Sequence, residues 1–156
     1  MAVTLRSVSP SDESFCYRLY EALQIERLGW QNWNGPERDG LLRLSYNGFK
    51  LTYQNIPGVE DQVIAEEEEP VGRLVLIHRD REVRLADIAL LPEARNRGLG
   101  TACLRLVMER ARLAGKVVRL QVSQNNQAQT LYKRLGFVAT GFNELDIEME
   151  WSGEIA

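Results

Sequence analysis

Residues 83–101 read VRLADIALLPEARNRGLGT and join a long apolar run to a polar, glycine-rich turn. The run at 83–91 is typical of a strand that is buried on both faces of a sheet. After Gly100 the apolar residues recur at helical spacing as far as Gly115, and another apolar run follows at 117–122. This order of strand, loop, helix and strand predicts two parallel strands joined by a right-handed crossover.

The flanking sequence predicts further helices and strands. Residues 3–8 alternate between apolar and polar, as a half-buried strand does. Ser9 and Pro10 then provide the N-cap and first-turn proline of a helix that continues to about Leu28. The remaining predicted elements are a helix from Pro36 to Tyr53, a hairpin at 62–66 and 71–78 with an acidic turn at 66–70, a helix from Asn126 to Leu135, and strands from Phe137 onward and at 145–151.

The composition indicates one globular domain over residues 1–156, with 44% hydrophobic and 26% charged residues. A net charge of −3 provides no basic surface for nucleic acid or for an anionic membrane. The N-terminus lacks the layout of a signal peptide, and no apolar run approaches the length of a membrane span. We therefore expect a cytoplasmic protein with neither nucleic acid nor a membrane as its partner.

The chain has two cysteines and one histidine. Cys16 and Cys103 both lie in apolar helical patterns, so we expect reduced thiols in the core of a cytosolic protein. Because His78 is the single histidine, a metal site built from several histidines and a Ser-His-Asp triad are both disfavoured. We expect no bound metal.

The glycine turn at 98–100 lies between the predicted buried strand and the start of a helix. The first amides of a helix have no intrahelical partners, and glycines let a phosphate approach the backbone closely. Arg95 and Arg97 add positive charge beside this turn. The sequence therefore predicts an anion site with the chemistry to hold a pyrophosphate.

Two other phosphate-binding motifs are excluded by spacing. A P-loop requires lysine and then serine or threonine directly after its last glycine, but Gly100 is followed by Thr101 and Ala102. A dinucleotide fingerprint requires a third glycine three residues after Gly100, where this chain has Cys103. It also requires an acidic residue at the end of the next strand, and residues 120–123 contain none.

Residues 95–100, RNRGLG, resemble the (Gln/Arg)-x-x-Gly-x-(Gly/Ala) pyrophosphate signature of the GNAT acyltransferase superfamily. The second motif of that superfamily is matched by LQV at 120–122, Asn126, Ala128 and LYKRLGF at 131–137. The two motifs span residues 83–137, and the order of the elements before them also fits. The resemblance implies an N-acetyltransferase that transfers an acetyl or related acyl group from acetyl-CoA to a primary amine, by direct attack while both substrates are bound.

The same resemblance implies an α/β fold of the GNAT type. We expect a mixed, mainly antiparallel sheet of six or seven strands, helices on both faces, and a V-shaped splay between two central parallel strands. The strand before the glycine turn would bind pantetheine through its backbone, and one of its amides would stabilise the oxyanion. The implied pantetheine contacts are Ile88, Ala89, Leu90 and Leu91, and the implied pyrophosphate contacts are Arg95, Asn96, Arg97, Gly98, Leu99, Gly100 and Thr101.

Tyr132 matches the tyrosine that commonly protonates the CoA thiolate in this superfamily. A tyrosine with an ordinary pKa keeps its proton at neutral pH, so the role is chemically sound. The alternative, that Tyr132 only belongs to the core face of its helix, stays open. Asn126 fits the motif spacing better than Asn125, and it would bind cofactor amides, cap its helix, or do both.

Asp87 is the ionisable residue within the apolar run at 85–91, and burial would raise its pKa toward a value that suits a general base. A structural hydrogen bond to a neighbouring loop is an equal alternative. Glu93 is expected to be solvated, whereas Glu21 or Glu26 could reach the acceptor from the first helix.

The variable N-terminal part would form the acceptor site, and its aromatic residues are candidates for the lining: Trp30, Trp33, Tyr46, Phe49 and Tyr53. Each of them is also a candidate for the core. The acceptor would be a small-molecule or peptide amine, and the sequence also leaves a homodimer open. A non-catalytic acyl-CoA-binding regulatory module is the rival interpretation.

Overall fold

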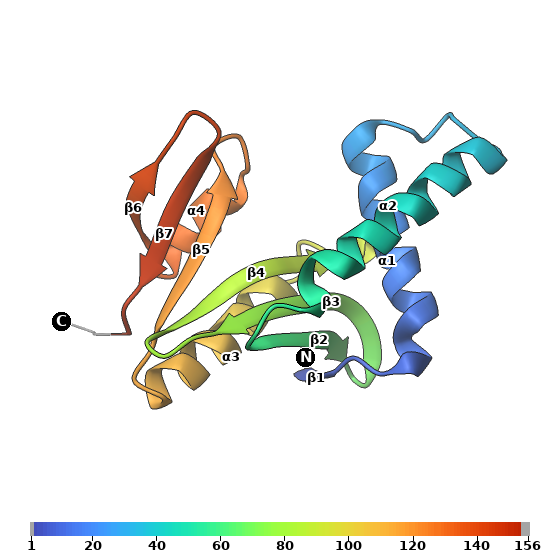
Figure 1. The fold of residues 1–156 in the computed structure, drawn as a ribbon. Coiled ribbons are helices and arrows are strands. Elements are labelled where there is room, and N and C mark those ends of the chain that lie inside the picture. The colour runs from blue at the N-terminus through green and yellow to red at the C-terminus, as the bar shows by residue number, and fades with distance from the viewer. Residues whose placement is uncertain (1, 154–156) are drawn as a thin grey trace.

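A computed structural model describes residues 2–153 as an α/β fold built on one mixed sheet of seven strands (Figure 1). The strand order is β1-β2-β3-β4-β5-β7-β6, and within the described residues the β4–β5 pair is parallel while the others are antiparallel. The predicted fold class is therefore confirmed.

The strands are β1 (Val3–Ser7), β2 (Val59–Glu66), β3 (Glu69–His78), β4 (Glu82–Leu90), β5 (Val117–Ser123), β6 (Val138–Phe142) and β7 (Asp146–Trp151). The helices are α1 (Glu13–Leu28), α2 (Pro36–Gln54), α3 (Leu99–Leu113) and α4 (Ala128–Arg134), with short 3-10 turns η1 (Pro10–Asp12) and η2 (Pro92–Ala94).

Asp12 fixes the junction between β1 and α1. The two amino groups of the Arg6 guanidinium each donate to its carboxylate at 2.8 Å, and the backbone amide of Ser9 donates to it at 2.8 Å. The Arg6 bonds first, and the Ser9 amide second, hold the pKa of the Asp12 carboxyl well below its usual range. The predicted first helix accordingly starts in two parts, as η1 at Pro10 and then as α1.

The acidic turn between β2 and β3 is shorter than the sequence predicts. Glu67 and Glu68 form it, with positive φ angles of 50° and 72°. This conformation suits a two-residue hairpin loop because it matches the twist of the paired strands. Glu66, Glu69 and Pro70 consequently lie in strands, and the predicted turn over 66–70 is wrong in its extent.

β4 and β5 pair over their first residues alone, from Glu82 to Leu85 of β4. Leu85 and Asp87 pair with consecutive residues of β3, so Ala86 between them forms a β-bulge. The bulge bends β4 at the point where its pairing to β5 ends. In Figure 1 the β5–β7–β6 arm diverges from β4 above this point, which is the predicted V-shaped splay.

Helices cover both faces of the sheet, as predicted. α3 and α4 pack on one face, where the main core includes Cys103 and Leu120. α1 and α2 cover the other face around a second cluster that includes Cys16 and Tyr46. Both cysteines are buried and unpaired. None of the helices in residues 2–153 is both long and apolar enough to cross a membrane.

Candidate active site

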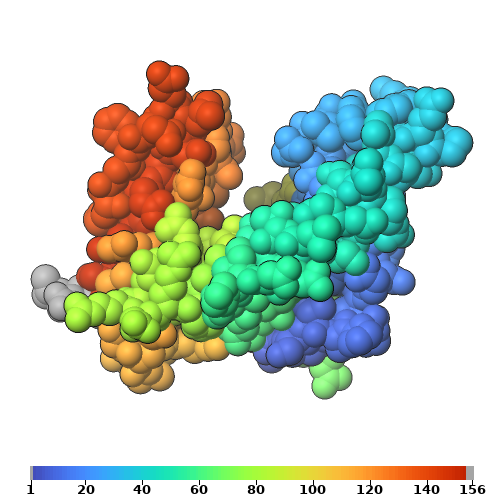
Figure 2. Space-filling view, in the orientation of Figure 1, coloured from blue at the N-terminus to red at the C-terminus, as the bar shows by residue number. Residues whose placement is uncertain are grey.

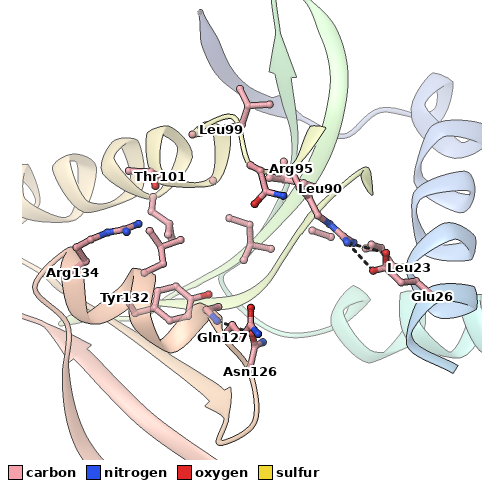
Figure 3. Close-up of a pocket in the computed structure, with 18 residues that line it drawn as sticks. Leu23, Glu26, Leu90, Arg95, Leu99, Thr101, Asn126, Gln127, Tyr132 and Arg134 are labelled. Carbon is pink, nitrogen blue, oxygen red and sulfur yellow. Dashed lines mark hydrogen bonds and ion pairs between the residues drawn. The ribbon is translucent and has the colours of Figure 1, made fainter. Parts of the chain in front are cut away.

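A cavity of about 790 Å³ opens between α3, α4 and the end of β4 (Figure 3). Its walls come from α1, the end of β4, the glycine turn with the start of α3, and residues 126–134. Most of the residues that the sequence predicts for cofactor binding line it, namely Ile88, Ala89, Leu90, Arg95, Asn96, Gly98, Leu99, Gly100, Thr101, Asn126 and Tyr132. Leu91 and Arg97 are not among the lining residues.

The glycine turn brings the N-terminus of α3 to the wall of this cavity. Gly98 is the N-cap of α3 and has a φ of 79°, in the left-handed region that L side chains rarely adopt. A Cβ on Gly100 would lie 3.8 Å from Leu90, which itself lines the cavity. The first amides of α3 have no intrahelical acceptors, so the positive end of the helix dipole faces the cavity. This arrangement suits an anion.

The arginine side chains beside the turn are engaged in ion pairs. Arg95 donates to both carboxylate oxygens of Glu26 on α1, at 2.7 and 3.0 Å, as the dashed lines in Figure 3 show. Arg97 donates to Glu66 at the end of β2, at 2.6 Å. Their charges near the turn are therefore largely neutralised, and the backbone contributes the free donors.

Arg134 is a cavity-lining cation that sequence reasoning missed. It stands on α4 and has no ion pair or hydrogen bond to a described residue. In Figure 3 its side chain extends toward Thr101 at the start of α3. Its place inside the LYKRLGF motif was a signal that could have found it, because Arg134 follows Tyr132 by two residues.

The end of β4 offers one open edge to the cavity. Residues 86–90 pair with β3 apart from the bulged Ala86, and they have no partner on β5. Leu91 departs from this pattern because its amide donates to the Val71 carbonyl at 2.9 Å and its side chain packs against the core. The unpaired β4 edge is thus available to an extended ligand, such as the pantetheine arm that the family resemblance implies.

Tyr132 reaches the splay from α4. Its side chain is 7% exposed, packs against the Phe137 ring at a centroid distance of 5.7 Å, and lines the large cavity. Burial raises the pKa of its phenol, and the charge of Asp87 raises it further. Tyr132 is consequently a core residue that also lines the cavity, and its role as a proton donor stays a prediction.

Asn126 is placed by a cap-like hydrogen bond. Its side-chain oxygen accepts the amide of Ala128 at 2.8 Å, where α4 begins. The helix therefore starts two residues later than predicted, because Asn126 folds its side chain back on the chain instead of joining the helix. Asn126 also lines the large cavity, so the cap leaves a cofactor contact open.

Asp87 and Tyr132 line a second, smaller cavity of about 170 Å³ at the splay, together with residues of β5. Burial raises the pKa of the Asp87 carboxyl, while the nearby Arg73 guanidinium opposes the shift and the charge of Asp61 adds to it. The amide of Ile88 donates to this carboxylate and also opposes the shift. The sequence-predicted acid and base thus meet in one cavity.

The residues that the sequence analysis proposed for the acceptor site lie partly in the core and partly at the surface. Tyr46 is fully buried at 0% exposure, and the rings of Trp30 and Trp33 meet edge to face with their centroids 4.9 Å apart. Tyr53 lines a separate cavity between α2, β2 and β3. Glu26 lines the large cavity, where Arg95 holds its carboxylate. Residues 2–153 contain no group of three or more His, Cys, Asp or Glu side chains that could hold a metal ion.

No curated protein matches the sequence. Three solved structures share the fold over nearly the whole chain. They are the PaiA N-acetyltransferase of Thermoplasma acidophilum in complex with coenzyme A (TM-score 0.73, 18% identity, 97% of this chain and 99% of that one), the ribosomal-protein-S18-alanine N-acetyltransferase of Escherichia coli (0.69, 17%, 99% and 96%), and a spermidine N-acetyltransferase chimera from Vibrio cholerae and hSSAT (0.70, 19%, 98% and 96%).

The family model that matches the chain carries the description acetyltransferase (GNAT) family, and the match covers residues 21–137. That range contains the end of α1, the splayed strand, the glycine turn and Tyr132. The two motifs that resembled this family lie inside it. The chain belongs to the GNAT acetyltransferase family.

Proposed function

We propose that this protein is an N-acetyltransferase that moves the acetyl group of acetyl-CoA onto a primary amine, by direct attack within a ternary complex. The observation that carries the proposal is the joining of three features by neighbouring cavities: the glycine turn, the open edge of β4, and the Asp87–Tyr132 pair at the splay. The glycine turn suits a pyrophosphate, the open edge of β4 suits an extended pantetheine arm, and the Asp87–Tyr132 pair suits a reacting thioester.

Acetyl-CoA would bind along the walls of the 790 Å³ cavity. The backbone amides of residues 97–101 would hold the pyrophosphate at the start of α3. The open edge of Ile88, Ala89 and Leu90 would pair with the pantetheine arm, as a strand would. Arg134 has no carboxylate partner among the described residues, so it is free to contact a phosphate.

The chemistry needs a proton acceptor for the amine and a proton donor for the departing sulfur. The amine nitrogen bonds to the thioester carbonyl carbon, the carbon–sulfur bond breaks, and an amide from the β4 edge stabilises the oxyanion. Asp87 takes the proton from the amine, directly or through one water. Tyr132 gives its phenol proton to the thiolate, and its raised pKa keeps that proton in place at neutral pH.

The proposal is tested by following thiol release from acetyl-CoA with a panel of amines, alongside a binding titration of acetyl-CoA. Binding together with amine-dependent thiol release supports the enzyme. Binding without release for any amine would instead support the non-catalytic acyl-CoA module, and absence of binding would overturn both.

A further inference from the structure

A third cavity, of about 370 Å³, lies where the end of α2 meets β2 and β3. Its lining residues are Lys50, Tyr53, Gln54, Val59, Asp61 and Arg73. The Arg73 guanidinium lies 5.4 Å from the Phe49 ring of α2, which places it on the face that α1 and α2 cover. The cavity is therefore on the face opposite α3, away from the walls that the cofactor would use.

Arg73 is a buried cation with one unused edge. Its side chain is 9% exposed, and its Nε and Nη2 atoms donate to the two oxygens of Asp61 at 2.8 and 2.5 Å. The Nη1 atom donates to no described residue. Nη1 is not one of the buried side-chain atoms that lack a partner among the described residues, so it is open to the cavity and can donate to a ligand there.

Each of the two cations that line this cavity has a carboxylate partner. Arg73 and Lys50 supply two positive charges, and Asp61 supplies one negative charge that already pairs with Arg73. The Lys50 ammonium is 39% exposed and lies 3.1 Å from Glu13, so it retains access to solvent and to a ligand. A carboxylate is the simplest group that pairs with the open Nη1 edge of the guanidinium.

The cavity is adjacent to the reacting centre. Val75 of β3 is opposite Asp87, and Arg73 is two residues from Val75 on the same face of the strand, which makes Arg73 and Asp87 diagonal neighbours about 7–8 Å apart at Cα. Tyr53 bridges the two cavities, since it lines the third one and its hydroxyl lies 3.5 Å from the carbonyl of Ala86, a lining residue of the splay cavity.

We propose that the acceptor is an amine that also carries a carboxylate, of the amino-acid type. Its carboxylate binds the Nη1 edge of Arg73 with help from Lys50, and its amine points toward Asp87. This inference rests on the proposed acetyl transfer and adds the class of acceptor. Arg73 is then a specificity-determining residue, and its pair with Asp61 holds the guanidinium in position.

The first test varies the acceptor and leaves the protein intact. Unbranched amino acids from glycine to 4-aminobutyrate are compared with their amides and with alkylamines of matched length, by thiol release from acetyl-CoA. One carboxylate-bearing acceptor should exceed its amide and its alkylamine by at least about tenfold in kcat/KM, as expected when a buried charged donor loses its partner. Equal values across each matched set would overturn the carboxylate site and leave the acetyltransferase proposal standing.

The second test changes Arg73. Arg73→Lys keeps a cation beside Asp61 but removes the second amino group, so KM for the preferred amino acid should rise at least about tenfold. KM for the matched alkylamine should not change, which a merely structural role for Arg73 would not predict. Arg112→Lys, in an exposed ion pair with Glu109 on α3, is the matched control and should change neither value. An equal rise for both acceptors would overturn the inference.

A direct binding measurement separates the two proposals if no amine is acetylated. Proton NMR of the wild-type protein with acetyl-CoA and 4-aminobutyrate, and then of Arg73→Lys, reports binding without turnover. Saturable binding that Arg73→Lys weakens would support the carboxylate site even where acetyl transfer fails. No saturable binding in the wild-type protein would overturn the site. Circular dichroism verifies that Arg73→Lys is folded. If the variant does not fold, the comparison of acceptors with the wild-type protein tests the carboxylate site instead.

Discussion

Asp87 on β4 and Tyr132 on α4 line one cavity of about 170 Å³, at the point where β4 and β5 separate. The two elements are distant in the chain, and the bulge at Ala86 with the end of β4–β5 pairing makes the opening between them. Burial raises the pKa of both groups, and the charge of Asp87 adds to the shift of Tyr132. The residues that we propose as base and acid therefore lie at one opening that the two substrates would reach from opposite faces. In Figure 2 a hollow separates the β5–β7–β6 arm from α1 and α2.

Replacing Tyr132 with phenylalanine keeps the ring against Phe137 and removes the proton. We expect kcat to fall by about 10²-fold or more while the Kd of CoA stays close to the wild-type value. Steady-state kinetics with a known acceptor and calorimetric titration of CoA measure the two quantities. Normal turnover, under conditions where the chemical step limits the rate, would assign protonation of the sulfur to water or to another residue.

Replacing Asp87 with asparagine preserves size and most hydrogen bonding. A base works in its deprotonated form, so wild-type kcat/KM should rise with pH through the raised pKa of Asp87. The variant should fold, lose most of its activity and lose that acidic limb of the pH–rate profile. A folded variant that retains both the rate and the limb would leave Asp87 with a structural role and direct attention to Glu21, Glu26 or a water chain.

The same substitution should change stability in a pH-dependent way. The pKa of Asp87 is raised on folding, so the folded state holds its proton more tightly, and the free energy of unfolding falls as pH rises from about 4 through the raised pKa. Asparagine does not titrate and avoids this loss. Asp87→Asn should therefore gain stability over the wild type between about pH 4 and pH 7.5, in urea denaturation at both values. A difference that is constant with pH would show that Arg73 compensates the buried charge.

Replacing Gly98 and Gly100 together with valine should weaken CoA binding by at least about tenfold, which corresponds to about 1.4 kcal/mol. Gly98 has a φ of 79° and caps α3, and a side chain at Gly100 would point toward Leu90 in the cavity wall. Close approach of a phosphate to the α3 amides would then be blocked. Calorimetry on a double variant with unchanged circular dichroism is the measurement, and unaltered affinity would remove this turn from the site.

Replacing Arg134 with glutamine should weaken CoA binding by about threefold to tenfold, and more at low salt, because an exposed cation that contacts a phosphate is screened by ions. Arg97→Gln is the matched control, since its side chain pairs with Glu66 away from the cavity lining, and it should change the affinity less. The opposite ranking of the two variants, in titrations at two salt concentrations, would show that Arg97 leaves Glu66 to meet the cofactor.

Sequence reasoning succeeded where the signal is local. The strand that ends at Leu90, the glycine turn and α3 were predicted together, because left-handed backbone at Gly98 and free helix amides depend on neighbouring residues alone. It was less accurate where a side chain bonds back to the chain. The hydrogen bond from the Ala128 amide to the Asn126 side chain delays the start of α4. The β2–β3 turn shortens to Glu67 and Glu68, because pairing between the strands decides which residues remain in the turn.

By itself the sequence determined the fold class, the family resemblance and the stretch of backbone that would meet a pyrophosphate. The tertiary structure alone decided that Arg95 and Arg97 pair with acids while Arg134 faces the cavity. It also decided that Asp87 lines one cavity with Tyr132 and lies near the Arg73–Asp61 pair. The physical reason is that backbone conformation follows from residues a few positions apart, whereas side-chain partners and pKa shifts depend on charges and burial supplied by other strands and helices.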